Sequence, residues 1–167
     1  GRKASAAPPW AGGVPLEVGD TTWGDPGWQT VAPSAVPLAE GWEPPHALSE
    51  MEITEIVEAF AASACRAHKA GFKVLEIHGA HGYLIHNFLS TLSNRRNDGY
   101  GGDLAGRMKF ALEVTEAVRT AWPDELPLFF RLSAVDNHGW SIDDSSVLAS
   151  ALKARGVDVI DCSAGGI

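Results

Sequence analysis

From residue 49 onward, segments with the apolar spacing of helices alternate with short runs typical of buried strands. Ser49 and Glu52 form a capping-box pattern, and the apolar periodicity that follows them stops at Gly71. Three strand-like runs are interleaved with the helical patterns, at residues 72–77, 127–133 and 157–162. This alternation predicts an α/β fold with a parallel sheet and right-handed crossovers, either a doubly wound sheet or a β/α barrel.

Two further helical patterns complete the alternation. One carries its apolar face over residues 110–118, and the other begins at Ser141 with Asp144 three positions later. The last two strand-like runs lie about 30 residues apart, which is the length of one β/α unit. A complete (β/α)8 barrel, or TIM barrel, needs about 250 residues. The chain has 167, so residues 49–167 could supply only an arc of such a barrel.

Residues 1–48 show no hydrophobic period and are interrupted by Pro and Gly pairs. Four tryptophans are scattered through this segment: Trp10, Trp23, Trp28 and Trp42. Large aromatic side chains are costly to leave in water, so we expect a long ordered loop excursion that these tryptophans pack onto the rest of the chain. The chain begins with Gly1, and Ile167 directly follows a strand-like run and two glycines. Both ends therefore resemble cut ends of a longer protein.

Composition excludes several classes of partner. Lys plus Arg is 13 and Asp plus Glu is 21, so the formal net charge is −8, and no nucleic-acid or anionic-membrane partner is expected. Apolar runs are too short to span a bilayer and no signal-peptide pattern opens the chain, which predicts a cytoplasmic protein. Cys65 and Cys162 lie far apart without metal-binding spacing, so both are expected to be reduced thiols.

Polar residues gather where the predicted strands end. In either parallel architecture, ligands bind at the carboxyl ends of the strands. Reading those ends predicts one polar rim, made of His78, His81, Tyr83, Arg131, Ser163, Gly165 and Gly166. Gly79 and Gly82 permit a sharp turn, so the two imidazoles and the phenol can converge. Two imidazoles that both donate could hold one ligand oxygen.

These residues also have alternative interpretations. His78, His81 and His86 could form the metal site of a hydrolase, but their spacing matches no standard ligand pattern and no acidic ligand is close, so no metal is expected. Arg131 lies in a strand between apolar neighbours, where an unpaired charge is costly, and must therefore have an ion-pair partner or a ligand. Structural roles are expected for the other histidines: His46, His68, His86 and His138.

Several stretches resemble one family of flavoenzymes. They are EIHGAHGYLIHNFLSTLSNRRNDGYGG (76–102), PLFFRLSA (127–134) and GVDVIDCSAGG (156–166). The opening GRKAS and the Ala32–Ser34 segment extend the resemblance over nearly the whole chain. The sequence resembles the old yellow enzyme family of FMN-dependent NADH:flavin oxidoreductases, or ene-reductases, and within it the thermophilic-like class.

The resemblance implies a fold, a cofactor and residue roles. The family fold is a (β/α)8 barrel that binds FMN, and this chain would be a central piece of it, from about the end of strand 3 through strand 6. His78 and His81 would bind the carbonyl or nitro oxygen of an activated alkene, and Tyr83 would donate a proton to its α-carbon. Arg131 would contact the pyrimidine side of FMN. NADH or NADPH would be the reductant, and a homo-oligomer is possible.

Physical chemistry agrees with these implied roles. Negative charge develops on the activating oxygen during hydride transfer, and two preorganised donors would stabilise it. A tyrosine with an ordinary pKa of about 10 is still an acid at neutral pH. The segments that hold the flavin phosphate in the family have no counterpart in these 167 residues. The alternative function is therefore a catalytically silent partial barrel.

Overall fold

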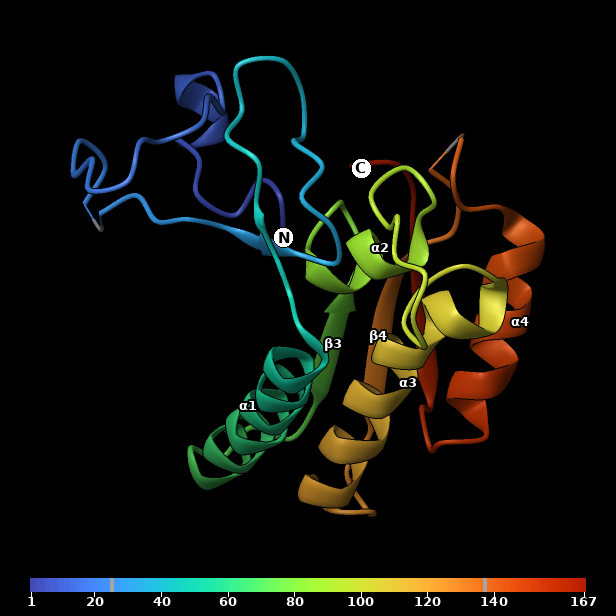
Figure 1. Cartoon of the computed structure of the whole chain (residues 1–167). Helices are drawn as coiled ribbons and strands as arrows, with labels where there is room; N and C mark the ends of the chain where they lie inside the picture. The colour runs from blue at the N-terminus through green and yellow to red at the C-terminus, as the bar shows by residue number, and fades with distance from the viewer. Residues whose placement is uncertain (25, 137) are drawn as a thin grey trace.

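The computed structural model describes residues 1–24, 26–136 and 138–167. A three-stranded sheet, four helices and a long N-terminal excursion make up this part of the chain (Figure 1). The elements are, in chain order, η1 (Pro9–Ala11), β1 (Val31–Ala32), β2 (His46–Ala47), α1 (Glu50–Lys69), β3 (Leu75–Gly79), α2 (Leu84–Leu89), α3 (Leu104–Ala121), β4 (Leu128–Ser133), α4 (Ile142–Lys153) and β5 (Val159–Ser163). No helix within the described residues is both long and apolar enough to cross a membrane.

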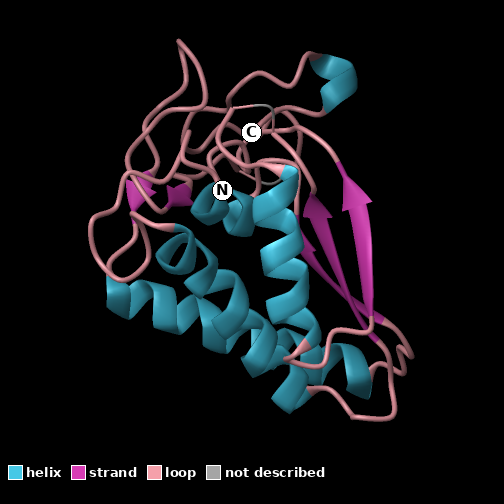
Figure 2. Cartoon of the chain, turned by 90° about the vertical axis from the view of Figure 1, so that its right-hand side faces the viewer, coloured by secondary structure: helices cyan, strands magenta, loops and turns pink. Residues whose placement is uncertain are grey.

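The main sheet is parallel, and its strands follow in chain order, β3-β4-β5. The register places His78, Arg131 and Asp161 side by side across the three strands. Helices α1, α3 and α4 all lie on the same side of this sheet (Figure 2). A doubly wound sheet would have helices on both faces. The predicted parallel α/β arrangement is thus confirmed, with the one-sided order of consecutive barrel units.

Helices α1 and α4 begin at the capping residues that the sequence predicted. The Ser49 hydroxyl accepts from the Glu52 amide, and the Glu52 carboxylate accepts from the Ser49 amide in return. Hydrogen bonds from Ser49 lower the pKa of Glu52 to about 2. Ser141 and Asp144 repeat this arrangement at the start of α4. These reciprocal bonds satisfy amide donors that the first turn of a helix leaves unpaired.

The two faces of the sheet differ in burial. One face packs against the helices and forms the core, which includes Ile77, Phe88, Phe110, Val114, Trp122, Leu128, Phe130, Leu132 and Leu148. The other face is open (Figure 2), and its side chains are at least partly exposed: Glu76, His78, Phe129, Arg131, Val159 and Asp161. Alternation along each strand therefore separates a buried apolar layer from a more exposed row that carries the charged side chains and His78.

Two of the predicted strands begin later and end later than expected. The first was predicted at 72–77, but β3 runs from Leu75 to Gly79, and Phe72 and Val74 are largely exposed. The first residue of β3 pairs with Leu128, the first residue of β4, so Phe72 and Val74 have no neighbouring strand. The last strand was predicted at 157–162 and is Val159–Ser163. The short helix α2 was not predicted.

The expectation that the N-terminal tryptophans pack onto the chain is wrong for three of them. Trp10 is 85% exposed, Trp23 49% and Trp28 50%. Much of the excursion lies apart from α1, α3 and α4 (Figure 1). Among its described residues, regular structure consists of η1, the two-residue parallel pair of β1 with β2 and one antiparallel bridge between Ala6 and Pro15. Trp28 and Trp42 line a cavity of about 360 Å³ that Arg2 also borders.

Candidate functional site

The turn between β3 and α2 brings three of the predicted site residues together. His78 is the penultimate residue of β3, and Tyr83 is the N-cap of α2. The His78 ring centroid lies 5.2 Å from that of His81 and 5.5 Å from that of Tyr83. His81 has a φ of 58° and Gly82 a φ of 71°. Two successive left-handed residues reverse the chain, and two imidazoles and a phenol share one end of the sheet as a result.

The carboxyl end of β5 packs directly against this turn. The His81 amide donates to the Ser133 hydroxyl (3.0 Å), which itself donates to the Gly165 carbonyl (2.8 Å). His81 Nε2 lies 2.6 Å from the Ser163 hydroxyl. A Cβ added at Gly82 would lie 1.9 Å from the carbonyl oxygen of Gly166, so only glycine fits there. Ser163, Gly165 and Gly166, which were predicted at the rim, therefore support the turn.

A lysine that the sequence reasoning missed lies beside the three rings. Lys3 Nζ is 5.3 Å from the centroid of the Tyr83 ring and donates to the Gly166 carbonyl at 2.9 Å. Burial lowers the pKa of Lys3, and the neighbouring Arg2 charge lowers it further. The GRKAS stretch contains this lysine, but nothing in its local pattern shows that it would reach Gly166, which is 163 positions away.

The surroundings of His78 favour the neutral imidazole, which can donate one hydrogen bond. Burial lowers its pKa, and the charges of His81, Arg131 and Lys3 act in the same direction. A neutral imidazole carries one N–H and one acceptor nitrogen. At neutral pH, His78 can thus donate one hydrogen bond to a ligand oxygen.

The sequence predicted that Arg131 has either an ion-pair partner or a ligand. The structure shows an ion-pair partner, Asp161. Arg131 lies on the open face of the sheet, and its Nε is 3.4 Å from Asp161 Oδ2. The two side chains are 38% and 40% exposed, so the pair is partly solvated. Nε has no hydrogen-bond partner within the described part of the chain. Asp161 was not singled out from the sequence, although it alternates correctly along the VDVIDC run.

His86 does not join His78 and His81 in a ligand cluster. Its side chain is fully buried beneath the turn, and its Nδ1 accepts a hydrogen bond from the Gly82 amide at 2.9 Å. Its Nε2 faces Asp136 Oδ2 at 3.6 Å. Among the residues that the structure describes, no three His, Cys, Asp or Glu side chains are grouped to hold a metal ion. The structural role predicted for His86 agrees with these contacts.

The buried His86 predicts a pH-dependent stability. Burial lowers its pKa to about 4, and although Asp136 opposes this shift, Lys3 and His81 reinforce it. As the pH falls below about 6.5, the unfolded chain binds the proton first, so stability is lost until the folded pKa is reached. Between pH 7 and 4.5 this group should cost the fold about 2 to 3 kcal/mol.

Urea titrations at several pH values, followed by circular dichroism, measure this loss. His86→Asn is the matched control, because it removes the titrating group while keeping a polar side chain. The difference between wild type and variant isolates His86 from the carboxylates that also titrate in acid. Identical pH slopes for the two proteins would contradict the prediction.

Comparison with known proteins shows the family to which this chain belongs. Residues 25–167 match the NADH:flavin oxidoreductase / NADH oxidase family. An NADPH dehydrogenase of Bacillus cytotoxicus is 47% identical over 139 residues, covering 82% of this chain and 40% of that protein. An NADH:flavin oxidoreductase of Gibberella zeae is 40% identical over 183 residues, covering the whole chain and 43% of that protein.

A solved structure agrees with these sequence matches. Morphinone reductase in complex with tetrahydroNAD superimposes with a TM-score of 0.72 at 33% identity, covering 81% of this chain and 42% of that one. The chain thus spans about 40% of the length of the curated relatives it matches. The protein belongs to the NADH:flavin oxidoreductase family, which is the family of old yellow enzyme.

Proposed function

We propose that this chain is the substrate-activating part of an FMN-dependent ene-reductase that reduces activated C=C bonds with NADH or NADPH. The observation that carries the proposal is the convergence of His78, His81 and Tyr83 at the carboxyl ends of a parallel sheet. Family membership supports the oxidoreductase class. The open sheet face supports the placement of the chain as an arc of a barrel, from about the end of strand 3 through strand 6.

In this proposal the three rings have two roles: the imidazoles bind the substrate oxygen, and the phenol donates a proton. Bound FMN would supply the hydride that the β-carbon of the alkene receives. His78 and His81 donate hydrogen bonds to the carbonyl or nitro oxygen, where negative charge develops. Tyr83 delivers a proton to the α-carbon, and its 42% exposure gives it access to a ligand. Fixed donors of this kind need little reorganisation during the reaction.

The Ser163 hydroxyl contacts one ring nitrogen of His81, Nε2, and leaves Nδ1 available for a substrate. That hydroxyl can donate to His81 Nε2 across the 2.6 Å between them. A neutral imidazole then carries its proton on Nδ1. We propose that Ser163 is the donor in this contact, so that His81 keeps its proton on Nδ1 and donates from there to the substrate oxygen. In the opposite tautomer, Nε2 would donate to Ser163 instead.

Arg131 fits one edge of a flavin. Its guanidinium lies on the open face of the sheet, and its Nε lacks a hydrogen-bond partner among the described residues. A permanently charged guanidinium stabilises the negative charge that a reduced flavin carries near N1. Arg131 would thus hold the pyrimidine side, while the Asp161 carboxylate orients the guanidinium. The contacts to the phosphate would come from parts of the barrel outside these residues.

A chimera tests the proposal. Replacing the matching segment of the Bacillus cytotoxicus NADPH dehydrogenase by this chain supplies the rest of the barrel. After incubation with FMN and gel filtration, the chimera is expected to retain flavin absorbance and to oxidise NADPH when an enone is added. A folded chimera that retains FMN but consumes no enone would favour the silent partial barrel. A folded chimera without flavin would contradict the proposed role in the cofactor site.

A further inference from the structure

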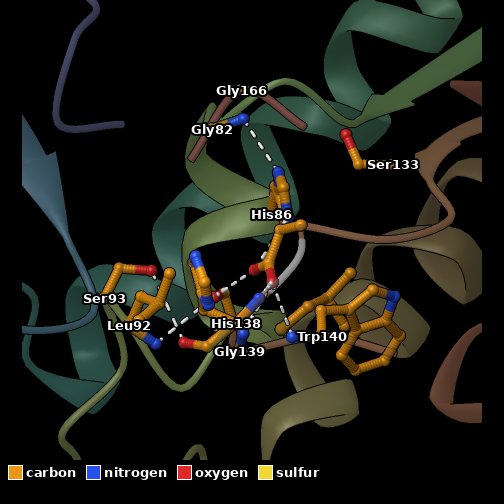
Figure 3. A network of polar contacts seen from close by, with 12 residues as sticks. Gly82, His86, Leu92, Ser93, Ser133, His138, Gly139, Trp140 and Gly166 are labelled. Atoms are coloured by element: carbon orange, nitrogen blue, oxygen red, sulfur yellow. Dashed lines mark hydrogen bonds and ion pairs between the residues drawn. The ribbon is translucent and has the colours of Figure 1, made fainter. Parts of the chain in front are cut away.

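We propose that His86 and Asp136 form a positioning pair, which holds the turn that presents His81 and Tyr83. The inference rests on the proposed function of those two residues and adds a residue pair that does not contact the substrate. Both side chains of the pair are fully buried. Figure 3 shows the His86 ring between Gly82 and the turn that contains His138, Gly139 and Trp140.

The Gly82 contact fixes the tautomer of His86. The Gly82 amide can only donate, and it lies 2.9 Å from Nδ1. Nδ1 must therefore be unprotonated, and a neutral ring then carries its proton on Nε2. That N–H faces the Asp136 carboxylate, whose Oδ2 is 3.6 Å away; the pair is electrostatic, because Nε2 has no hydrogen-bond partner among the described residues. The carboxylate thus favours the one tautomer that can accept from Gly82.

Asp136 is itself held in place. Its Oδ1 accepts from the amides of His138 (3.1 Å), Gly139 (2.6 Å) and Trp140 (2.8 Å). Its Oδ2, the oxygen that faces His86, accepts from the Ser90 hydroxyl. Burial raises the pKa of this carboxyl, but these hydrogen bonds outweigh burial and the pKa is lowered. The β4–α4 loop thereby presents a fixed negative charge to the underside of the ring.

The turn above His86 needs such support. His81 has a positive φ although it is not glycine, a conformation that costs about 1 kcal/mol or more. Gly82 is held from two sides, by His86 at its amide and by the Asn87 side chain at its carbonyl (3.1 Å). Loss of the amide contact would free the peptide between His81 and Gly82 to rotate. Both neighbouring site residues, His81 and Tyr83, would then lose their fixed orientation.

The wild-type chain alone provides the first test. Long-range ¹H–¹⁵N NMR spectra of the 167-residue chain distinguish a protonated from an unprotonated ring nitrogen. His86 is expected to be neutral from pH 8 to 5.5, with its proton on Nε2 and an unprotonated Nδ1. A proton on Nδ1 in this range would overturn the proposal. This measurement needs neither flavin nor a variant.

Two matched substitutions provide the second test. His86→Leu fills the space but cannot accept a hydrogen bond, whereas His86→Asn can place its amide oxygen near the position of Nδ1. Hydrogen exchange at the Gly82 amide is expected to be about 30-fold faster in His86→Leu. In His86→Asn it should stay within about threefold of wild type. The NMR signals of His81 and Tyr83 should shift in the Leu variant and be largely restored in the Asn variant.

Exchange at the core amides of Val114 and Phe130 controls for global unfolding. If Gly82 stays protected in His86→Leu while the His81 and Tyr83 signals are unchanged, His86 does not position the turn. If the Asn variant loses as much protection as the Leu variant, the acceptor at Nδ1 is not what matters. Neither result depends on alkene reduction, so failure of the proposed function remains a separate outcome.

Discussion

Replacing Asp136 by alanine is expected to lower the free energy of unfolding by about 3 to 5 kcal/mol, which is a large share of the stability of a small protein. The carboxylate is fully buried and accepts hydrogen bonds from the Ser90 hydroxyl and from the amides of Gly139 and Trp140. A buried donor that loses its acceptor costs about 1 to 3 kcal/mol, and several lose it at once here. Urea denaturation followed by circular dichroism measures the change.

Two control variants separate this network from a general effect of charge removal. Asp124 is a fully exposed carboxylate 3.9 Å from Arg119 Nε, and Asp124→Ala should leave the urea midpoint nearly unchanged. Asp136→Asn keeps one acceptor oxygen but loses the charge, so an intermediate loss is expected. If Asp136→Ala unfolds within 1 kcal/mol of wild type, the amides of the β4–α4 loop must find other acceptors readily.

The parts of the fold that depend on local signals were predictable from sequence. Helix starts at Ser49 and Ser141 were correct because a capping box involves residues only three positions apart. The order of helices and strands was correct because apolar periodicity reports burial directly. Strand ends were less accurate, because β3 begins where β4 begins, and β4 is more than 50 residues further along the chain.

Two kinds of feature were not predicted correctly: a short helix, and packing that depends on distant parts of the chain. Helix α2 has only six residues, Leu84–Leu89, and five of them are buried, so it shows no polar face that periodicity could detect. The tryptophans of the excursion were expected to pack because burial favours aromatic rings in general. Nothing local shows which surface is available to them, and Trp10 remains exposed.

The candidate site shows the same division. His78, His81 and Tyr83 all lie in one short stretch at the end of a single strand. Their convergence could therefore be predicted from local sequence. The supporting contacts join distant segments: Ser163 lies 82 positions from His81, and Asp136 lies 46 positions from Ser90. Such pairs leave no trace in spacing or periodicity, and only the folded chain shows them.

The second large effect concerns catalysis in the flavin-loaded chimera. Replacing His78 or His81 by alanine is expected to lower kcat/KM for enone reduction by about 30- to 1,000-fold, which corresponds to about 2 to 4 kcal/mol of lost transition-state stabilisation. Steady-state rates with NADPH and an enone measure the loss, and flavin absorbance confirms that each variant still holds its cofactor. His46→Ala is the control, because His46 pairs with Glu52 on an exposed surface and is not one of the three converging rings.

A variant that lacks both His78 and His81 tests whether the two imidazoles bind the same substrate oxygen. If the two imidazoles hold one substrate oxygen, removing the second should cost less than removing the first, because residues that act as a unit are not additive. Fully additive losses would indicate that His78 and His81 contact different parts of the substrate. Unchanged reduction in the double variant would exclude both from oxygen binding. The geometry of two rings with centroids 5.2 Å apart favours the shared contact, so the non-additive result is expected.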